Sequence, residues 1–143
     1  MSLLEELYRE TIMIHAQKPH NFGALANPTV ESRGHNTSCG DMITIYLQSD
    51  GERIADVSFQ GQGCAISQSS ASMMTDLVKG RSFSEARELI KKFKEMVVEG
   101  KEAAPELGDL RALAGVSKLH SRVKCATLAW NALEQALVEA QNK

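Results

Sequence analysis

Aromatic residues are scarce in this chain of 143 residues, at 5% of the total, and no stretch of the sequence forms a basic stripe. Lys and Arg number 16 against 18 Asp and Glu, which gives a formal net charge of −2 at pH 7. Proteins that bind nucleic acids usually present clustered positive charge, and those that bind single strands add aromatic side chains on which bases stack. We therefore expect no nucleic-acid partner.

Long apolar runs are missing as well. No window approaches the roughly 20 apolar residues of a membrane-spanning helix. The N-terminal stretch MSLLEELYRE carries acidic residues where a signal peptide needs a basic start and an unbroken apolar run. We expect no membrane partner and a cytoplasmic location, where thiols stay reduced.

Cysteine is rare, with three residues far apart at positions 39, 64 and 125. An odd number at such spacing does not predict a disulfide framework, and it leaves metal ligation, thiol chemistry and simple burial as alternatives. The remaining composition, 43% hydrophobic and 24% charged, is typical of a globular chain. Its length matches one domain, so we expect residues 1–143 to form a single domain.

Alternating apolar residues predict a β-hairpin in the first half of the chain. Strands are expected at residues 42–47 and 54–59, joined by the turn Asp50-Gly51, and residues 29–34 are the candidate third strand. An isolated hairpin is only marginally stable in water, so helices have to cover its apolar face. The inward side chains of its second strand are expected to be Ala55, Val57 and Phe59.

Apolar residues at helical spacing predict helices on both sides of this hairpin. Five are expected: residues 3–14 with Ser2 as cap, residues 66–77 ended by Gly80, a helix starting at Ser82, a short helix over 106–114 and a last helix from about Ser121. Glu85 completes a capping box with Ser82, and the pair Met73-Met74 is interpreted as core. The predicted fold class is α+β, a small antiparallel sheet of about three strands packed by helices.

The three cysteines fall at the ends of these predicted elements. Cys39 precedes the first strand of the hairpin and Cys64 follows the second, so hairpin geometry brings the two close together. Cys125 is expected within the first turn or so of the last helix, and its spacing alone does not place it beside the others. Asp41 points to the same side as Cys39 if the chain is extended there.

Three thiolates and one carboxylate make a set of four ligands, which suits tetrahedral zinc, while soft sulfur also suits copper(I) or iron–sulfur species. His120 is an alternative to Asp41 as fourth ligand. Arg122, one helical turn before Cys125, is a candidate catalytic residue that pairs with Asp41 or steadies anionic sulfur, and the alternative is a solvated surface arginine. Three further histidines are interpreted as solvent or capping residues: His15, His20 and His35.

Three segments around the cysteines carry a family resemblance. They are Asn36-Thr37-Ser38-Cys39-Gly40-Asp41, Gly61-Gln62-Gly63-Cys64-Ala65-Ile66-Ser67 and Arg122-Val123-Lys124-Cys125-Ala126. Together with Tyr8, His15, Pro19 and Asn21-Phe22-Gly23, they resemble the motifs of the IscU/SufU/NifU-N proteins of iron–sulfur cluster assembly. The resemblance implies an α+β fold and a role beside a cysteine desulfurase.

Three departures from IscU scaffolds indicate the SufU branch. Lys124 stands where those scaffolds have a histidine before the third cysteine, the stretch between Cys64 and Cys125 is long, and the Leu-Pro-Pro-Val-Lys segment is absent. Resemblance to SufU implies a zinc-dependent sulfurtransferase that accepts persulfide sulfur from a SufS-type, pyridoxal-phosphate-dependent cysteine desulfurase and supplies a downstream iron–sulfur scaffold. It implies Cys39 as the sulfur acceptor and four zinc ligands: Cys39, Asp41, Cys64 and Cys125.

Three other functions are alternatives. A scaffold could assemble a transient [2Fe–2S] cluster on the same residues, because cysteine thiolates ligate such clusters. A zinc-stabilised adaptor without catalytic activity is the second. A thiol hydrolase with Cys39 as nucleophile is the third, and it is disfavoured because His35 is the only histidine near Cys39 in the sequence.

Overall fold

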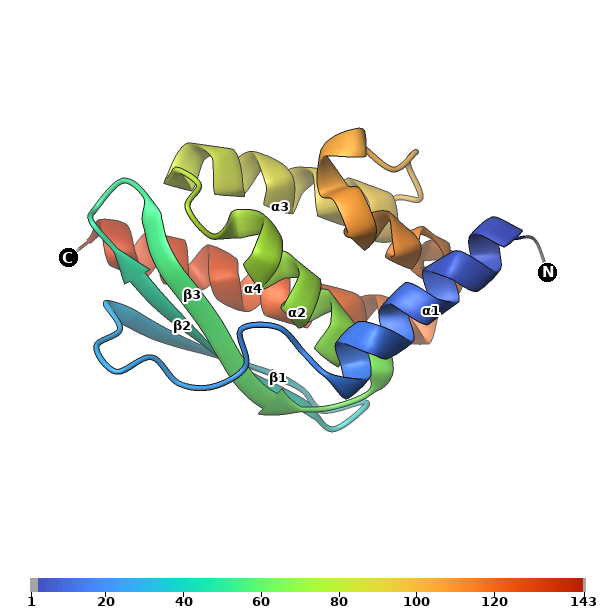
Figure 1. The fold of residues 1–143 in the computed structure, drawn as a ribbon, viewed down its shortest axis with the longest axis horizontal. Helices are drawn as coiled ribbons and strands as arrows, with labels where there is room; N and C mark the ends of the chain where they lie inside the picture. The colour runs from blue at the N-terminus through green and yellow to red at the C-terminus, as the bar shows by residue number, and fades with distance from the viewer. Residues whose placement is uncertain (1–2, 143) are drawn as a thin grey trace.

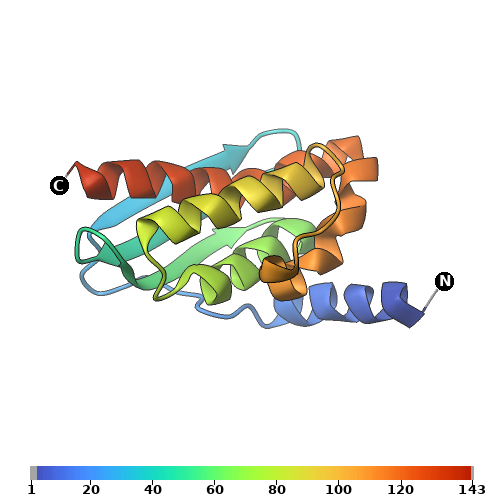
Figure 2. The ribbon, with the colours of Figure 1, turned by 90° about the horizontal axis from the view of Figure 1, so that it is seen from above.

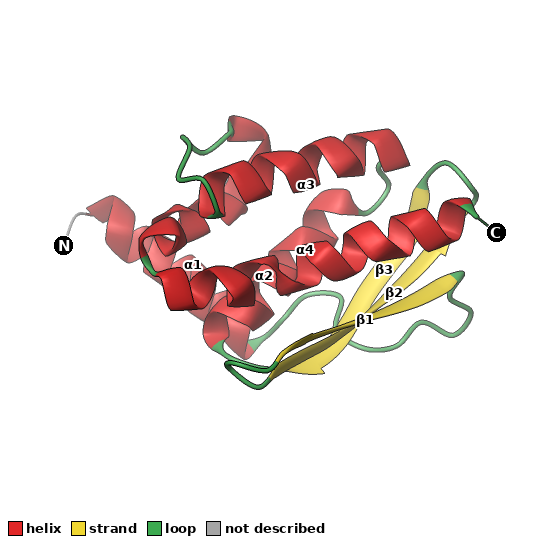
Figure 3. Cartoon of the chain, turned by 180° about the vertical axis from the view of Figure 1, so that it is seen from behind, coloured by secondary structure: helices red, strands yellow, loops and turns green. Residues whose placement is uncertain are grey.

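The computed structural model describes residues 3–142, apart from the side chain of Leu4, so the predicted cap Ser2 lies outside the described residues. The elements in chain order are helix α1 (Leu3–Gln17), strands β1 (Val30–Asn36), β2 (Asp41–Ser49) and β3 (Ile54–Gln62), helices α2 (Ala65–Val78) and α3 (Phe83–Val97), the 3-10 segment η1 (Pro105–Lys118) and helix α4 (His120–Gln141). The strands lie on one side and the helices cover a single face of them (Figures 1 and 3). The predicted α+β class is confirmed.

The sheet is antiparallel with the order β1-β2-β3, which confirms the candidate third strand. Alternation in β2 places Ile43, Ile45 and Leu47 in the core and leaves Met42 exposed. This is the pattern expected of a sheet with one packed face. The helical layer supplies the other half of the core, where Phe93 of α3 and Trp130 of α4 stack with ring centroids 4.3 Å apart.

The prediction that Ala55 faces the core is wrong. The register of β2 and β3 shifts between Gln48 and Ser49, because β3 carries one residue more than its partner there. An extra residue reverses the alternation on the bulged strand. Ile54 therefore takes the inward position and is fully buried, while Ala55 is exposed.

The helices begin and end close to the predicted residues. The Ser82–Glu85 capping box is present at the start of α3. Helix α2 ends just before Gly80, whose φ of +82° lies in the left-handed region that favours glycine. The short helix predicted over 106–114 is instead a 3-10 segment over Pro105–Lys118. Gly108, with φ 56° and ψ −128°, interrupts its helical geometry.

Helix α1 is amphipathic, but the apolar stripe of Leu3, Leu7 and Ile14 faces away from the body of the protein, with exposed fractions of 83%, 57% and 54%. Its inward face carries Ile12, which packs on the core, and His15, which is buried. In the view from above, α1 lies beside α2 and η1 (Figure 2). None of the helices within residues 3–142 has the length and hydropathy to cross a bilayer.

Candidate metal centre

Three of the predicted ligands converge at one end of the sheet. Potential ligand atoms of Cys39, Asp41 and Cys125 all lie within 4.8 Å of one another. Cys39 is in the turn between β1 and β2, Asp41 is the first residue of β2, and Cys125 is in the second turn of α4. The Cys39 thiol is 4.0 Å from the carbonyl oxygen of Ser121, which ties the turn to the start of α4.

Asp41 is fully buried, and each of its carboxylate oxygens accepts a hydrogen bond. The backbone N–H of Cys64 donates to Oδ1 over 3.0 Å, and Asn36 Nδ2 donates to Oδ2 over 3.4 Å. Asn36 Nδ2 is also 3.6 Å from Cys125 Sγ. Asn36 thus links two of the three converging residues, and the antiparallel register that pairs it with Asp41 is the signal that could have revealed it.

Cys64 occupies the N-cap of α2 and is half-buried. It lies outside the 4.8 Å trio, although its backbone N–H donates to Asp41. Gly63 before it is closely packed, since a Cβ there would lie 2.4 Å from Asp41 Oδ1. The backbone of the β3–α2 junction therefore packs directly against the Asp41 carboxylate.

The electrostatics of the centre favour a positive charge. Burial, followed by hydrogen bonds with Asp41, Cys39 and Cys64, raises the pKa of the Cys125 thiol. A hydrogen bond to Cys125 and the negative charges of Cys64, Cys125 and Cys39 raise the pKa of the Arg122 guanidinium. Arg122 itself is exposed at the start of α4, and its role stays a prediction.

The donor set fits a metal ion. None of the ion pairs formed within residues 3–142 includes Asp41, so this buried carboxylate has no cationic side chain paired with it. An unpaired buried charge is costly. Zinc binds both thiolate sulfur and carboxylate oxygen, so three thiols and one carboxylate suit it, and one divalent ion would offset the charge of Asp41.

Ser67 was missed at the level of sequence. It lies in the first turn of α2 and is almost fully buried, and its hydroxyl has no hydrogen-bond partner within the described part of the chain. A Cβ at Gly63 would lie 3.1 Å from Ser67 Oγ, which puts this hydroxyl next to the Asp41 carboxylate. No sequence pattern signals an unpartnered hydroxyl.

The environments of the histidines differ in part from the prediction. His35 and His120 are exposed, and His120 belongs to neither of the two potential ligand clusters found in residues 3–142. The interpretation of His15 as a solvent or capping residue is wrong, because its side chain is buried and its Nδ1 is 2.6 Å from Ser72 Oγ. His20 is exposed but hydrogen-bonds with Asp76 at 2.6 Å.

An α+β domain with thiols gathered at one end of its sheet is the class that this fold and site define. Residues 7–143 match the family described as the NifU-like N-terminal domain, and the chain belongs to that family. This confirms the resemblance inferred from the cysteine motifs.

Two similar proteins carry different functional names. The zinc-dependent sulfurtransferase SufU of Bacillus subtilis is 43% identical, with 96% of this chain and 94% of that protein covered. The iron–sulfur cluster assembly scaffold protein IscU of Streptococcus pyogenes is 44% identical, with 99% and 89% covered. One name is that of a sulfurtransferase and the other that of a cluster assembly scaffold, and the two identities do not distinguish between them.

A solved structure is also similar. It is the crystal structure of a candidate iron–sulfur cluster assembly scaffold protein for the SUF system from Fervidobacterium islandicum. That structure is 39% identical with a TM-score of 0.83, and 93% of this chain and 98% of that one are covered. The sheet and the helices that cover it are therefore shared along nearly the full length of the chain.

Proposed function

We propose that this protein is a zinc-dependent sulfur acceptor in iron–sulfur cluster assembly. It takes persulfide sulfur from a SufS-type, pyridoxal-phosphate-dependent cysteine desulfurase onto Cys39 and passes that sulfur to a downstream iron–sulfur scaffold. The observation that carries the proposal is a gradient of exposure: Cys39 is exposed, Cys64 is half-buried and Cys125 is buried. The outermost sulfur is the one that a partner protein can reach.

The zinc ligands in this proposal are Cys39, Asp41, Cys64 and Cys125. Bound zinc would supply the positive charge that keeps coordinating thiols deprotonated near neutral pH. Asp41 and Cys125 are fully buried, and Asn36 contacts both of them, so these side chains form the fixed part of the site. Cys39 lies in a four-residue turn, where its sulfur can move toward a docked partner while the buried ligands stay in place.

The transfer step is a thiol–persulfide exchange. The Cys39 thiolate attacks the outer sulfur of the desulfurase persulfide, and a new sulfur–sulfur bond forms on Cys39. The bond between that outer sulfur and the desulfurase cysteine breaks, and the desulfurase cysteine leaves as a thiolate. No electrons are gained or lost overall, so the step needs no external oxidant or reductant.

Arg122 is the second candidate catalytic residue. The pKa of its guanidinium is raised, first by Cys125 and then by Cys64 and Cys39, so the three cysteines are its main electrostatic neighbours. A fixed positive charge beside the exchange stabilises the thiolate before attack and the anionic persulfide afterwards. The exposed position of Arg122 also lets it contact the desulfurase.

Persulfide mapping tests this proposal. The zinc-loaded protein is incubated with a SufS-type desulfurase and cysteine, and the added sulfur is located by mass spectrometry of peptides. We expect persulfide on Cys39 in the wild type and in Ser38→Ala, an exposed control in the same turn, and none in Cys39→Ser. Normal sulfur acceptance by Cys39→Ser would show that the assignment is wrong.

The second candidate is a scaffold for a transient [2Fe–2S] cluster, which the name of the Streptococcus pyogenes relative favours. Anaerobic reconstitution with iron and sulfide separates the two functions. A sulfur acceptor retains zinc and forms little stable cluster. A stable cluster at full yield that transfers to an acceptor protein would favour the scaffold.

A further inference from the structure

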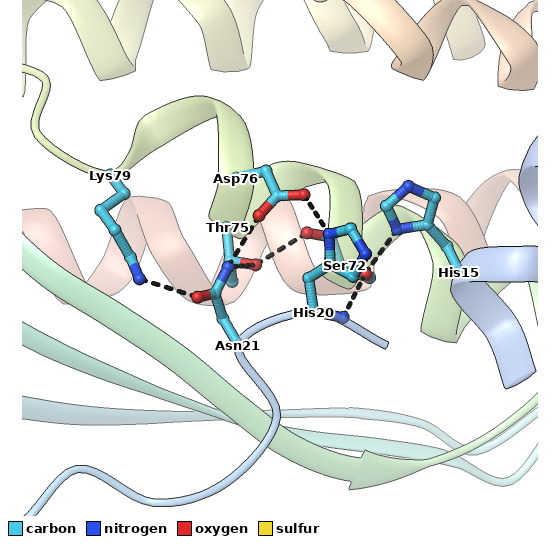
Figure 4. A network of polar contacts seen from close by, with 7 residues as sticks. All are labelled: His15, His20, Asn21, Ser72, Thr75, Asp76 and Lys79. Atoms are coloured by element: carbon cyan, nitrogen blue, oxygen red, sulfur yellow. Dashed lines mark hydrogen bonds and ion pairs between the residues drawn. The ribbon is translucent and has the colours of Figure 1, made fainter. Parts of the chain in front are cut away.

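A second group of potential ligands lies outside the cysteine centre. His15 near the end of α1, His20 in the segment that follows and Asp76 of α2 place one ligand atom each within 4.8 Å of the others. Figure 4 shows the two imidazole rings and the carboxylate together beside α2. The ring centroids of His15 and His20 are 4.5 Å apart, and His20 Nδ1 is 2.6 Å from Asp76 Oδ2.

Ser72 fixes both histidines from the middle of α2. Its hydroxyl is 2.6 Å from Nδ1 of His15 and accepts the backbone N–H of His20 over 2.8 Å. Ser72 is itself fully buried. Histidines that bind metals are usually oriented by a hydrogen bond to the other ring nitrogen, as Ser72 provides for His15, whereas it holds His20 by the backbone.

Asp76 is oriented in the same way by Asn21. The side-chain Nδ2 of Asn21 donates to Asp76 Oδ1 over 2.9 Å and to Thr75 Oγ1 over 3.0 Å. The side-chain Oδ1 of Asn21 accepts a hydrogen bond from Lys79 Nζ over 2.7 Å. Asn21 is held in turn by the sheet, because its backbone carbonyl accepts the backbone N–H of Phe59 in β3 over 3.0 Å. Asp76 Oδ2, the oxygen next to His20, is left facing the histidines (Figure 4).

There is also space beside the cluster. A cavity of about 200 Å³ is lined by His15 and Asp76, and also by Asp109 of η1. That volume accommodates water molecules that would complete a coordination sphere. Burial and the neighbouring His20 lower the pKa of His15 against the opposing effect of Asp76 and Asp109, which favours the neutral imidazole that binds metals.

We propose that His15, His20 and Asp76 form a second, open metal site for a divalent first-row transition metal ion, of which Zn²⁺ is the probe to use. Two imidazoles and a carboxylate are a common zinc ligand set that leaves positions for water. Tetrahedral zinc with bonds of about 2.0–2.1 Å holds its ligand atoms roughly 3.3 Å apart. Ligand atoms that already lie within 4.8 Å of one another need only small movements to reach this geometry.

This site has no residue in common with the cysteine centre and differs from it in chemistry. Its donors are nitrogen and oxygen, whereas the cysteine centre offers mainly sulfur. A bound ion would join the end of α1 and the segment after it to α2. The inference does not depend on sulfur transfer, and its failure would leave the proposed function untouched.

Titration of the zinc-loaded protein with further Zn²⁺ tests the proposal. The cysteine centre is filled first with one equivalent, so that additional binding reports on other sites. Calorimetry should then show one further event in the wild type, and this event should weaken at least tenfold in His20→Ala and in Asp76→Ala. His20 is exposed in the segment after α1 and Asp76 is exposed on α2, so both variants should fold, as circular dichroism would check.

Two histidines outside the cluster supply matched controls. His35→Ala and His120→Ala each remove an exposed imidazole and should keep the second binding event unchanged. Further Zn²⁺ should also raise the thermal midpoint of the wild type but not that of His20→Ala. The proposal is overturned if the wild type shows no second event, if His20→Ala or Asp76→Ala retains it, or if either control loses it.

Discussion

Gly63 and Asn36 are the two residues beside the cysteines that determine how Asp41 is held. Gly63 leaves space for the carboxylate, and Asn36 donates a hydrogen bond to it. Neither residue supplies a metal ligand. Both act on the position of Asp41, and a displaced carboxylate weakens the whole ligand set.

Gly63→Ala should weaken zinc binding at least tenfold. The new Cβ would lie 2.4 Å from Asp41 Oδ1 and would push the carboxylate out of place. Gly115→Ala is the matched control, because no heavy atom lies within 4 Å of its added Cβ. Competition with a chromophoric chelator measures both affinities, and wild-type affinity in Gly63→Ala would contradict this role.

Periodicity predicted the hairpin whose ends carry Cys39 and Cys64, and only the resemblance to the family motifs added Cys125, which the structure places beside Cys39 and Asp41. The sequence was not sufficient to find Asn36, Ser67 or the pairing of His15 with His20. Those features depend on strand register and on side chains that meet across α2, and neither leaves a periodic signal. At Ala55 the prediction failed because a bulge reverses alternation without any marker in composition.

At the scale of elements, α2 is the helix on which both potential metal sites depend. Its N-cap is Cys64, its middle holds His15 through Ser72, and Asp76 lies in its last turn. It is joined to α4 by Ser70, whose hydroxyl donates to the Ala126 carbonyl over 2.7 Å and accepts from Trp130 Nε1 over 3.0 Å. Buried serines thus attach α2 to different parts of the protein: Ser72 to His15 of α1, and Ser70 to α4.

Ser70→Ala should destabilise the protein by about 1–3 kcal/mol, because it leaves the buried indole N–H of Trp130 without its acceptor and removes a second hydrogen bond to the Ala126 carbonyl. Ser67→Ala removes a buried hydroxyl that has no partner in residues 3–142, so its free energy of unfolding should stay close to that of the wild type. Urea unfolding of the zinc-loaded variants compares them. Equal losses of unfolding free energy in Ser70→Ala and Ser67→Ala would contradict the different roles assigned to the two hydroxyls.

The contact of α1 with α2 should be sensitive to pH. The pKa of His15 is lowered from 6.5 by burial and then by His20, against Asp76 and Asp109, so the unfolded chain binds its proton at higher pH than the folded one. The stabilising effect of a neutral His15 is therefore complete above pH 6.5 and is lost as pH falls from there through the lowered pKa.

His15→Gln should remove this dependence. The difference in unfolding free energy between about pH 7.5 and about pH 5.5 should be smaller in His15→Gln than in the wild type. His120→Gln, which changes an exposed histidine, should behave like the wild type. An identical pH dependence in His15→Gln and the wild type would contradict the burial argument.

At the scale of the whole molecule, the cysteine centre joins parts of the chain that are distant in sequence. The β1–β2 turn, the β3–α2 junction and α4 each contribute to it (Figure 1). The core lies elsewhere, between the inner face of the sheet and the helices, and it includes the stacked Phe93 and Trp130. The fold therefore has support that does not depend on a metal.

Removal of zinc should lower the thermal midpoint by several degrees without unfolding the chain at room temperature. Circular dichroism before and after chelation measures both effects. Unfolding on chelation would instead favour the structural adaptor, in which the metal is needed for the fold. An unchanged midpoint would indicate that no metal binds to the folded protein.

X-ray absorption at the zinc edge tests most directly whether Cys39, Asp41, Cys64 and Cys125 hold one ion. The zinc-loaded wild type should show three sulfur neighbours at about 2.3 Å and one oxygen at about 2.0–2.2 Å. The Asp41→Cys variant should convert this shell to four sulfurs. A wild-type shell dominated by nitrogen and oxygen, or fewer than three sulfurs around the ion, would contradict the account.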